Sequence, residues 1–299
     1  MNNIKTNRDK LIIQSVVGAI ADPPMRVVSP YRISADGEPM VMPGTGGITY
    51  NAQIGDSAID WWADHVEPGV TIRHADADRN SVNNGALQIL ACVGNKARIV
   101  TGDAKDDIGR ITGKHGGVYH LMVDFPVEKL ENMVNGDKML IKSCGQGLAM
   151  TEFPEIKIMN LDPDLFEVMD LRGDSKTGKV RIPVTHTIPS AVMGSGLGHA
   201  DTVEGDYDIQ MFDPETVEQY KMNELRFGDI VAILDADHSF GRIYRKHSIS
   251  IGVVVHSRSV LAGHGPGVTT LFTSSKGDID VAMDPNANLK NLFEKLKEE

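Results

Sequence analysis

Short apolar runs separated by turn residues recur along most of the chain. Runs of this length, bounded by pairs such as Gly94-Asn95 and Gly102-Asp103, are typical of strands joined by tight turns. The run at 251–255 is entirely apolar, which predicts a buried strand. We expect strands at residues 11–20, 87–93, 98–101, 111–112, 118–123, 138–142, 230–234, 243–250 and 251–255. Many short strands at this spacing predict a barrel or a sandwich, so the expected fold is mainly β with a few short helices.

Helical patterns are few and short. Pro126 and Pro214 each begin an apolar stripe at helical spacing, and Asp213 is placed to cap the second helix. A short helix is expected at 57–63, where it carries a pair of tryptophans. The tail at 286–299 is amphipathic and should dock on the body of the protein or on another subunit.

A chain of 299 residues is long for one ordinary domain, and two are expected. Each half contains a helix, a Gly-Asp turn and a strand in succession, at 126–142 and at 213–234. The order of the other elements differs between the halves, so a simple duplication is not indicated. We predict two β-barrel-like or sandwich-like lobes, at 1–150 and 151–299.

Composition narrows the class of protein. A formal charge of −11 without a basic stripe argues against a nucleic-acid partner. No window approaches the roughly 20 apolar residues of a membrane span, and two cysteines are too few for a disulfide framework. These features predict a soluble, cytoplasmic protein. The tryptophan pair Trp61-Trp62, the amphipathic tail and the many apolar short strands offer contact surface and favour a homo-oligomer.

The strongest chemical signal lies between residues 194 and 208. Glycines, among them Gly196 and Gly198, allow the backbone to come close to a ligand. Imidazole and carboxylate groups follow within ten residues, and such groups repel and desolvate one another unless a cation or water satisfies them. Zn, Mn or Fe suits this mixture of nitrogen and oxygen ligands, whereas the alternative is a polar loop facing water. The ionisable residues are His199, Asp201, Glu204, Asp206 and Asp208.

Other histidines are candidates for the same chemistry. His74 and Asp76 would share one face of an extended segment, roughly 7 Å apart, as ligands or as charges protecting an exposed edge strand. His115 and His264 are each flanked by glycine, which predicts exposed turns with backbone N–H groups near the ring. Such a histidine binds or polarises a ligand, or is an ordinary turn residue.

Two resemblances add to this picture. The runs PGTGGITYN (43–51), DHVEPGV (64–70), GDAKDDIGRITGKHGGVYHLMVDFP (102–126), GQGL (145–148) and VVVHSRSVLAGHGPGVTTL (253–271) resemble a bacterial family described as domain of unknown function 4438. That resemblance covers nearly the whole chain and implies a two-lobe, mostly β protein without an established activity.

Residues 183–209 are also similar to a segment of the acetamidase/formamidase enzymes. This resemblance implies that His199, Asp206 and Asp208 take the positions of that segment's His, Asp and Glu. The chain departs from the segment at Leu197, which replaces an Asp, and two residues are inserted before Gly205. Tyr207 stands in place of a glycine. Asp201 lies within the insertion and is a substitute for the missing carboxylate.

These signals lead to one functional hypothesis and one alternative. The hypothesis is a metal-dependent hydrolase of a small amide or related C–N bond, in which a divalent metal activates water. His199 and Asp206 would be ligands, joined by histidines from other segments such as His264 and His74. Asp208 would be a ligand or a general base, and the glycine-rich backbone would stabilise the oxyanion. The alternative is a non-enzymatic protein that binds a small ligand or packs into an assembly.

Overall fold

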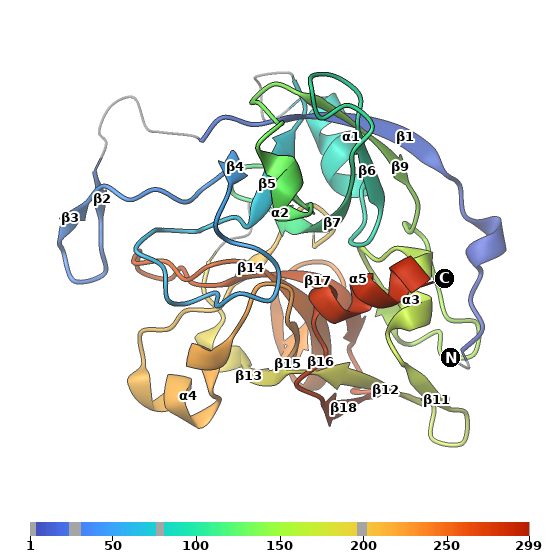
Figure 1. Cartoon of the computed structure of the whole chain (residues 1–299). Helices are drawn as coiled ribbons and strands as arrows, with labels where there is room; N and C mark the ends of the chain where they lie inside the picture. Colours follow the sequence, from blue (N-terminus) through green and yellow to red (C-terminus); the bar gives the residue numbers. More distant parts are fainter. Residues whose placement is uncertain (1–3, 24–30, 76–80, 196–201, 299) are drawn as a thin grey trace.

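The structure, a computed structural model, describes residues 4–23, 31–75, 81–195 and 202–298. In these residues 37% of the chain is strand and 16% is helix, the latter in five short α-helices and three 3₁₀ turns. The expected fold class, mainly β with a few short helices, is confirmed. Figure 1 shows two β-rich layers, one above the other, with α5 (Leu289–Glu298) running beside their junction.

The first layer is a closed six-stranded barrel. Closure follows from the pairing of β1 with both β9 and β5, so that the sheet returns on itself. In spatial order, the barrel strands are β1 (Gln14–Ile20), β9 (Lys138–Ser143), β6 (Lys96–Ile99), β7 (Ile108–His115), β8 (His120–Asp124) and β5 (Gly69–Arg73). A short seventh strand, β4 (Ile48–Thr49), pairs with β5.

Alternation along the strands fills the barrel. In β6 and β9, every second residue is buried, because successive side chains on a strand point to opposite faces. Ala97, Ile99, Met139 and Ile141 are therefore inside, each with no exposed surface. Burial of aliphatic side chains of this size contributes about 1.5–3 kcal/mol each.

The second layer is built around a long hairpin. Its strands are β10 (Lys157–Ile158), β17 (Gly267–Ser274), β16 (Ile243–His256), β15 (Ile230–Asp237) and β13 (His186–Pro189), with β14 (Tyr207–Asp208) pairing β17. The two strands expected at 243–250 and 251–255 form the single strand β16. Its last residues are all buried, as the apolar run predicts.

Two smaller sheets complete the fold. One contains β11 (Arg172–Asp174), β12 (Lys179–Val184) and β18 (Ile279–Met283). The other is the hairpin of β2 (Arg32–Ile33) and β3 (Pro39–Met40), which projects from the body in Figure 1.

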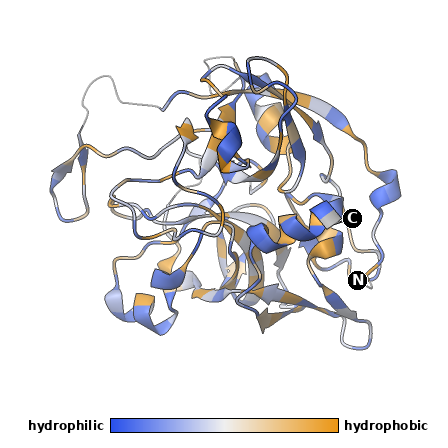
Figure 2. Cartoon of the chain, viewed as in Figure 1, coloured by the Kyte–Doolittle hydropathy of each residue, from blue (hydrophilic) through white to orange (hydrophobic). Residues whose placement is uncertain are grey.

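The helices match the sequence patterns only in part. They are α1 (Val82–Leu90), α2 (Val127–Leu130), α3 (Pro163–Val168), α4 (Pro214–Gln219) and α5, with single 3₁₀ turns at Arg8–Lys10, Ser190–Val192 and Met222–Glu224. Asp213 caps α4, where its carboxylate accepts a hydrogen bond from the backbone N–H of Thr216. Helix α5 carries both hydrophobic and hydrophilic residues (Figure 2), and Leu289, Leu292 and Phe293 bury its apolar face on the body.

Two local predictions are wrong. Residues 87–90 belong to α1 and not to a strand, because Ser81 caps a helix that buries Leu87 on the barrel. Residues 57–63 form turns instead of a helix. The Ser57 hydroxyl accepts hydrogen bonds from the N–H groups of Ile59 and Asp60, and such side-chain bonds favour turns over helix. Trp61 is partly buried, whereas Trp62 is 81% exposed.

The two layers meet where β7 lies on β16 and β17. The Thr269 hydroxyl accepts a hydrogen bond from the backbone N–H of Lys114 at 3.0 Å and donates one to its carbonyl at 3.1 Å. Gly113 allows this approach, since a Cβ there would lie 2.0 Å from Cγ1 of Val255. The ends of β7 and β16, at His115 and His256, therefore lie side by side. No helix in the described part of the chain is long and apolar enough to cross a membrane.

Candidate metal centre

Six ionisable side chains meet at the junction of the two layers. They are His65, His115, Asp206, Asp208, His256 and His264. Their potential ligand atoms form three overlapping groups of three, and within each group the atoms lie within 4.8 Å of one another. The groups are His65, His115 and His256; His65, Asp208 and His264; and Asp206, Asp208 and His256. All six are buried except His264, whose side chain is 33% exposed.

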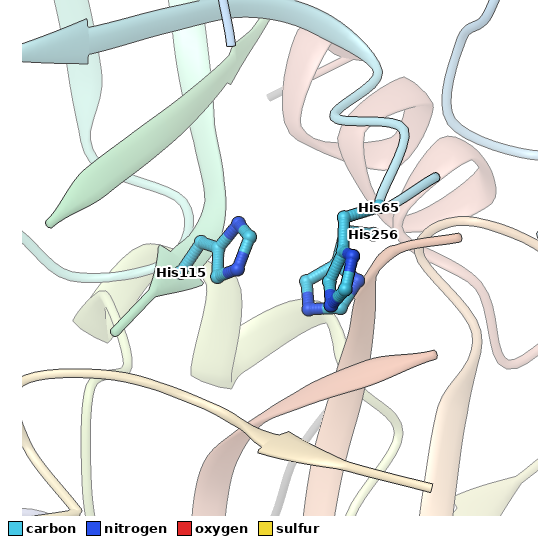
Figure 3. Close-up of side chains that lie close together, drawn as sticks. All are labelled: His65, His115 and His256. Atoms are coloured by element: carbon cyan, nitrogen blue, oxygen red, sulfur yellow. The ribbon is translucent and has the colours of Figure 1, made fainter. Parts of the chain in front are cut away.

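Strand ends bring these residues together from distant parts of the sequence. His115 is the last residue of β7, and His256 is the last residue of β16. Asp208 lies in β14 and pairs with Gly267 at the start of β17, which also pairs with His256. His65 comes from the loop before β5, where its φ of 52° places it in the left-handed region. Figure 3 shows the rings of His65, His115 and His256 facing a common space.

Gly267 allows the carboxylate of Asp206 and the imidazole of His256 to approach each other. A Cβ at this position would lie 2.0 Å from Oδ2 of Asp206 and 2.2 Å from Nε2 of His256. Any other residue would occupy the space into which the carboxylate and the imidazole point. The absence of a side chain at Gly267 therefore leaves room for the Asp206 carboxylate and the His256 imidazole.

Each of the three central histidines is oriented through its Nδ1 atom. Nδ1 of His65 lies 3.0 Å from Oδ2 of Asp64, and Nδ1 of His115 lies 2.5 Å from Oε1 of Glu67. Nδ1 of His256 lies 3.0 Å from the carbonyl oxygen of Ser257. Because these acceptors hold the proton on Nδ1, Nε2 of a neutral ring is left with a lone pair; Nε2 of His256 has one only when that ring is deprotonated, which metal binding would require. Carboxylate or carbonyl groups behind a histidine are the usual support of a metal ligand.

The two supporting carboxylates are themselves fixed. Asp64 accepts hydrogen bonds from the Ser259 hydroxyl at 2.6 Å, from the Val260 N–H at 3.1 Å and from Arg32 at 2.6 Å. Burial raises the pKa of Asp64, but the hydrogen bond and charge of His65 outweigh this effect and hold the pKa below its usual range. The carboxylate is therefore ionised at neutral pH.

Glu67 is completely buried and contacts two imidazoles, because His115 and His120 both approach its oxygens. The Thr71 hydroxyl donates a further hydrogen bond to it. Burial raises the pKa of Glu67, yet the neighbouring His120 and His115 lower it well below its ordinary value. Glu67 is therefore a second buried anion behind the cluster.

At the centre, imidazole nitrogens and carboxylate oxygens form close ion-pair contacts. Nε2 of His256 lies 2.8 Å from Oδ2 of Asp206 and 3.3 Å from Oδ1 of Asp208, and Nδ1 of His264 lies 2.9 Å from Oδ2 of Asp208. Four of these atoms lack a hydrogen bond of acceptable geometry to a described residue: Oδ2 of Asp206, both carboxylate oxygens of Asp208 and Nε2 of His256. Ligands about 2.1 Å from one cation are separated by about 3.0–3.4 Å, depending on its geometry. The observed separations fit a shared cation.

The other oxygen of Asp206 is satisfied. Oδ1 accepts a hydrogen bond of 2.8 Å from the backbone N–H of Gly116, at the turn between β7 and β8. This bond fixes the carboxylate so that Oδ2 faces His256. The glycine-rich turn after His115 therefore supplies a backbone N–H group as expected, but this group binds the carboxylate of Asp206 and not a ligand.

The charges of the central groups depend on one another. Burial lowers the pKa of His256, but Asp206 and Asp208 outweigh it and raise this pKa well above the usual value. Burial raises the pKa of Asp208, whereas His256 and His264 pull it below its normal range. Asp208 raises the pKa of His264, and burial lowers that of His65. A cluster of this kind binds a proton or a metal cation between its carboxylates.

The structure brings together four of the residues singled out in the sequence: Asp206, Asp208, His115 and His264. His115 is buried and not on an exposed turn, because it ends β7 and faces Glu67. His74 belongs to none of the three groups, because β5 carries the chain roughly 20 Å away from the cluster between Glu67 and His74. Asp76, Gly196, Gly198, His199 and Asp201 lie outside the described residues.

Several central residues were not singled out by the sequence reasoning. They are Asp64, His65, Glu67, His120 and His256. His256 ends the apolar run at 251–255, and a histidine at the end of a buried strand is the signal that was available. The other four are separated by as many as 56 positions, and only the pairing of β5, β7 and β8 brings them together.

A hollow of about 480 Å³ lies beside the cluster, and Asp64 forms part of its wall. Aromatic residues Tyr50, Trp61 and Trp62 line it together with Arg32 and the glycine-rich turn at 43–46. This hollow has the size of a small-molecule site. Asp64 thus contacts His65 on one side and lines the hollow on the other.

Comparison with known proteins assigns the chain to a family. The family described as Domain of unknown function (DUF4438), N-terminal, matches residues 31–167, and its C-terminal counterpart matches residues 169–293. The chain belongs to the DUF4438 family. It is similar to the crystal structure of TM1086, with 45% sequence identity and a TM-score of 0.89 over 96% of this chain and 98% of that one. No curated protein matches the chain.

Proposed function

We propose that this protein binds a divalent cation at the His/Asp cluster and hydrolyses a small amide or a related C–N bond. The ligands are Oδ2 of Asp206, Oδ1 of Asp208 and Nε2 of His256. The observation that supports the proposal is the approach of Nε2 of His256 to Oδ2 of Asp206 at 2.8 Å and to Oδ1 of Asp208 at 3.3 Å, in a geometry outside that of an ordinary hydrogen bond. Three protein ligands leave coordination positions open for water and substrate.

Zn, Mn or Fe is suited to this combination of one imidazole and two carboxylates. Such a cation lowers the pKa of bound water and polarises a carbonyl oxygen, which are the two requirements of amide hydrolysis at neutral pH. Asp208 acts in this scheme as a ligand, because its carboxylate lies between two imidazoles.

His115 is the general base. Glu67 holds its Nδ1–H at 2.5 Å, so Nε2 is free to accept a proton, and the carboxylate stabilises the imidazolium that results. The water oxygen forms a bond to the carbonyl carbon as its proton passes to His115. The C–N bond then breaks, and His115 returns the proton to the departing nitrogen. The products are a carboxylic acid and ammonia or an amine.

The substrate class rests on the similarity of residues 183–209 to acetamidase/formamidase enzymes. Two of the three residues matched in that segment, Asp206 and Asp208, belong to the cluster. The small size of the neighbouring hollow, about 480 Å³, supports a small substrate. The partner is accordingly a small molecule.

The test begins with protein that has been freed of metal by chelation. It is reloaded with Zn²⁺, Mn²⁺ or Fe²⁺, and the release of ammonia from formamide, acetamide and longer primary amides is measured. We expect metal-dependent turnover that is lost in His256→Ala. The matched control is His247→Ala, which removes an exposed histidine from the same strand, β16. Absence of metal uptake by the wild-type protein would contradict the proposal.

A second candidate function is binding of a small ligand without catalysis. The aromatic hollow beside Asp64 favours it, because Trp62 is 81% exposed and provides a surface for stacking. Under this alternative, a ligand quenches tryptophan fluorescence and raises the melting temperature of the protein. Both effects are as large in protein freed of metal by chelation as in untreated protein. The hydrolase proposal requires that chelation abolish turnover.

A further inference from the structure

We infer that the cluster holds two divalent cations, bridged by the carboxylate of Asp208. This inference rests on the metal centre of the proposed function and adds a second ion to it. The first ion lies between Asp206, Asp208 and His256. The second lies between His65, Asp208 and His264.

The six side chains do not converge on one point. In an octahedral site with ligands at about 2.1 Å, even opposite ligands are only about 4.2 Å apart. Six ligands of one ion would therefore form one group within the 4.8 Å limit, whereas these side chains separate into three groups of three. Asp206 and His264 share no group. The arrangement has two centres.

Asp208 connects the two centres because its oxygens face different imidazoles. Oδ1 lies 3.3 Å from Nε2 of His256, and Oδ2 lies 2.9 Å from Nδ1 of His264. Both oxygens are buried and lack a hydrogen bond of acceptable geometry to any described residue. A carboxylate with one oxygen toward each set of ligands is placed to bridge two ions.

The second set of ligands has the dimensions of a metal site. Nε2 of His65 and Nδ1 of His264 lie within hydrogen-bond distance at 3.2 Å, which is also close to the separation of two ligands on one cation. Asp64 holds Nδ1 of His65, so the His65 lone pair faces His264. His264 is the one partly exposed member of the set, which gives the second ion a path from solvent.

The charges of the surroundings also favour bound cations. Four carboxylates, Asp64, Glu67, Asp206 and Asp208, are each no more than 2% exposed. Among the described lysines and arginines, only Arg32 forms an ion pair with any of them. Burying uncompensated charge costs several kcal/mol per ion. Arg32 offsets the charge of Asp64, so three carboxylate charges remain. One divalent cation leaves one of these three uncompensated, and a second cation more than offsets it.

Two ions bridged by one carboxylate have a consequence for catalysis. A pair of metals about 3.5–4 Å apart would orient the attacking water and polarise the carbonyl oxygen of the amide. His115 belongs to neither set of three ligands and is supported by Glu67, which leaves it free to move the proton. Of the six residues in the cluster, five are then metal ligands and His115 is the general base.

The experiment measures stoichiometry. Chelated, metal-free protein is titrated with Mn²⁺, and bound metal is counted by equilibrium dialysis with elemental analysis. We expect two Mn²⁺ per wild-type chain and an electron paramagnetic resonance spectrum of a coupled pair. His264→Ala should bind one ion and lose the coupling, while the exposed control His247→Ala should bind two.

The outcomes separate the two proposals. One Mn²⁺ per wild-type chain would overturn the second site and leave the metal centre of the proposed function intact. No bound Mn²⁺ would overturn both. Two ions in His264→Ala would show that the ligands of the second site are wrongly assigned. Circular dichroism establishes whether His264→Ala is folded. If the variant does not fold, the number of Mn²⁺ ions bound by the wild-type protein still decides whether the second site exists.

Discussion

Replacement of Gly267 by Ala provides a sharp perturbation of the cluster. The added Cβ would lie 2.0 Å from Oδ2 of Asp206 and 2.2 Å from Nε2 of His256, whereas ordinary contacts begin at 3.4 Å. The ligands must therefore move by more than about 1 Å, and metal–ligand distances tolerate about 0.2 Å. The φ of Gly267 is outside the left-handed region, so the strand accepts alanine.

We expect Gly267→Ala to weaken metal binding at least about 100-fold, the upper range for disturbed support of a metal ligand. Overpacking of this kind changes the stability of the metal-free protein by about 1–3 kcal/mol, so the fold should persist. Isothermal titration of metal-free protein with Zn²⁺ measures the affinity, and thermal melting measures the stability.

The matched control is Gly117→Ala, in the turn between His115 and His120. A Cβ at Gly117 would meet nothing within 4 Å, so Zn²⁺ affinity should remain at the wild-type value. The reasoning is refuted if Gly267→Ala binds Zn²⁺ as tightly as the control does. The clash would then be relieved without displacing the assigned ligands.

Other predictions concern stability and assembly. Burial raises the pKa of Asp124 to about 6, so the stability it contributes when protonated is lost as pH rises from about 4 through 6. Asp124→Asn should therefore gain about 1–2 kcal/mol at pH 8 and progressively less toward pH 4; an equal gain at both pH values would exclude titration as the cause. Phe293→Ala should cost about 3–5 kcal/mol in urea unfolding, because the ring is 4% exposed on α5, while the exposed Lys295→Ala should change little. Light scattering should give a mass larger than one chain, and a monomer mass at micromolar concentration would contradict the expected homo-oligomer.

The fold class could be predicted because its signals are local. The apolar run at 251–255 and the caps at Asp213-Pro214 each depend on neighbouring residues, and β16 and α4 follow from them. Residues 87–90 were misassigned because a short apolar run fits a buried strand or the buried face of a helix. The helical assignment depends on Ser81, six residues earlier, which caps α1.

The candidate site could be predicted only in part. Asp206 and Asp208 stand out because they lie close together in a glycine-rich sequence. His65 and His256 are 191 positions apart, and their rings come within 5.0 Å only through the packing of β7 on β16 and β17. No local pattern carries that information. His74 was a candidate ligand in the sequence, but it lies at the far end of β5 from the cluster.

The most direct test of the account is anomalous diffraction from crystals grown with Zn²⁺, recorded on both sides of the zinc absorption edge. The account predicts a peak about 2.0–2.2 Å from Nε2 of His256 and from the facing oxygens of Asp206 and Asp208. It also predicts a second peak between His65 and His264. Zinc bound elsewhere on the protein, with no peak at the His/Asp cluster, would contradict the central claim that this cluster is a metal centre.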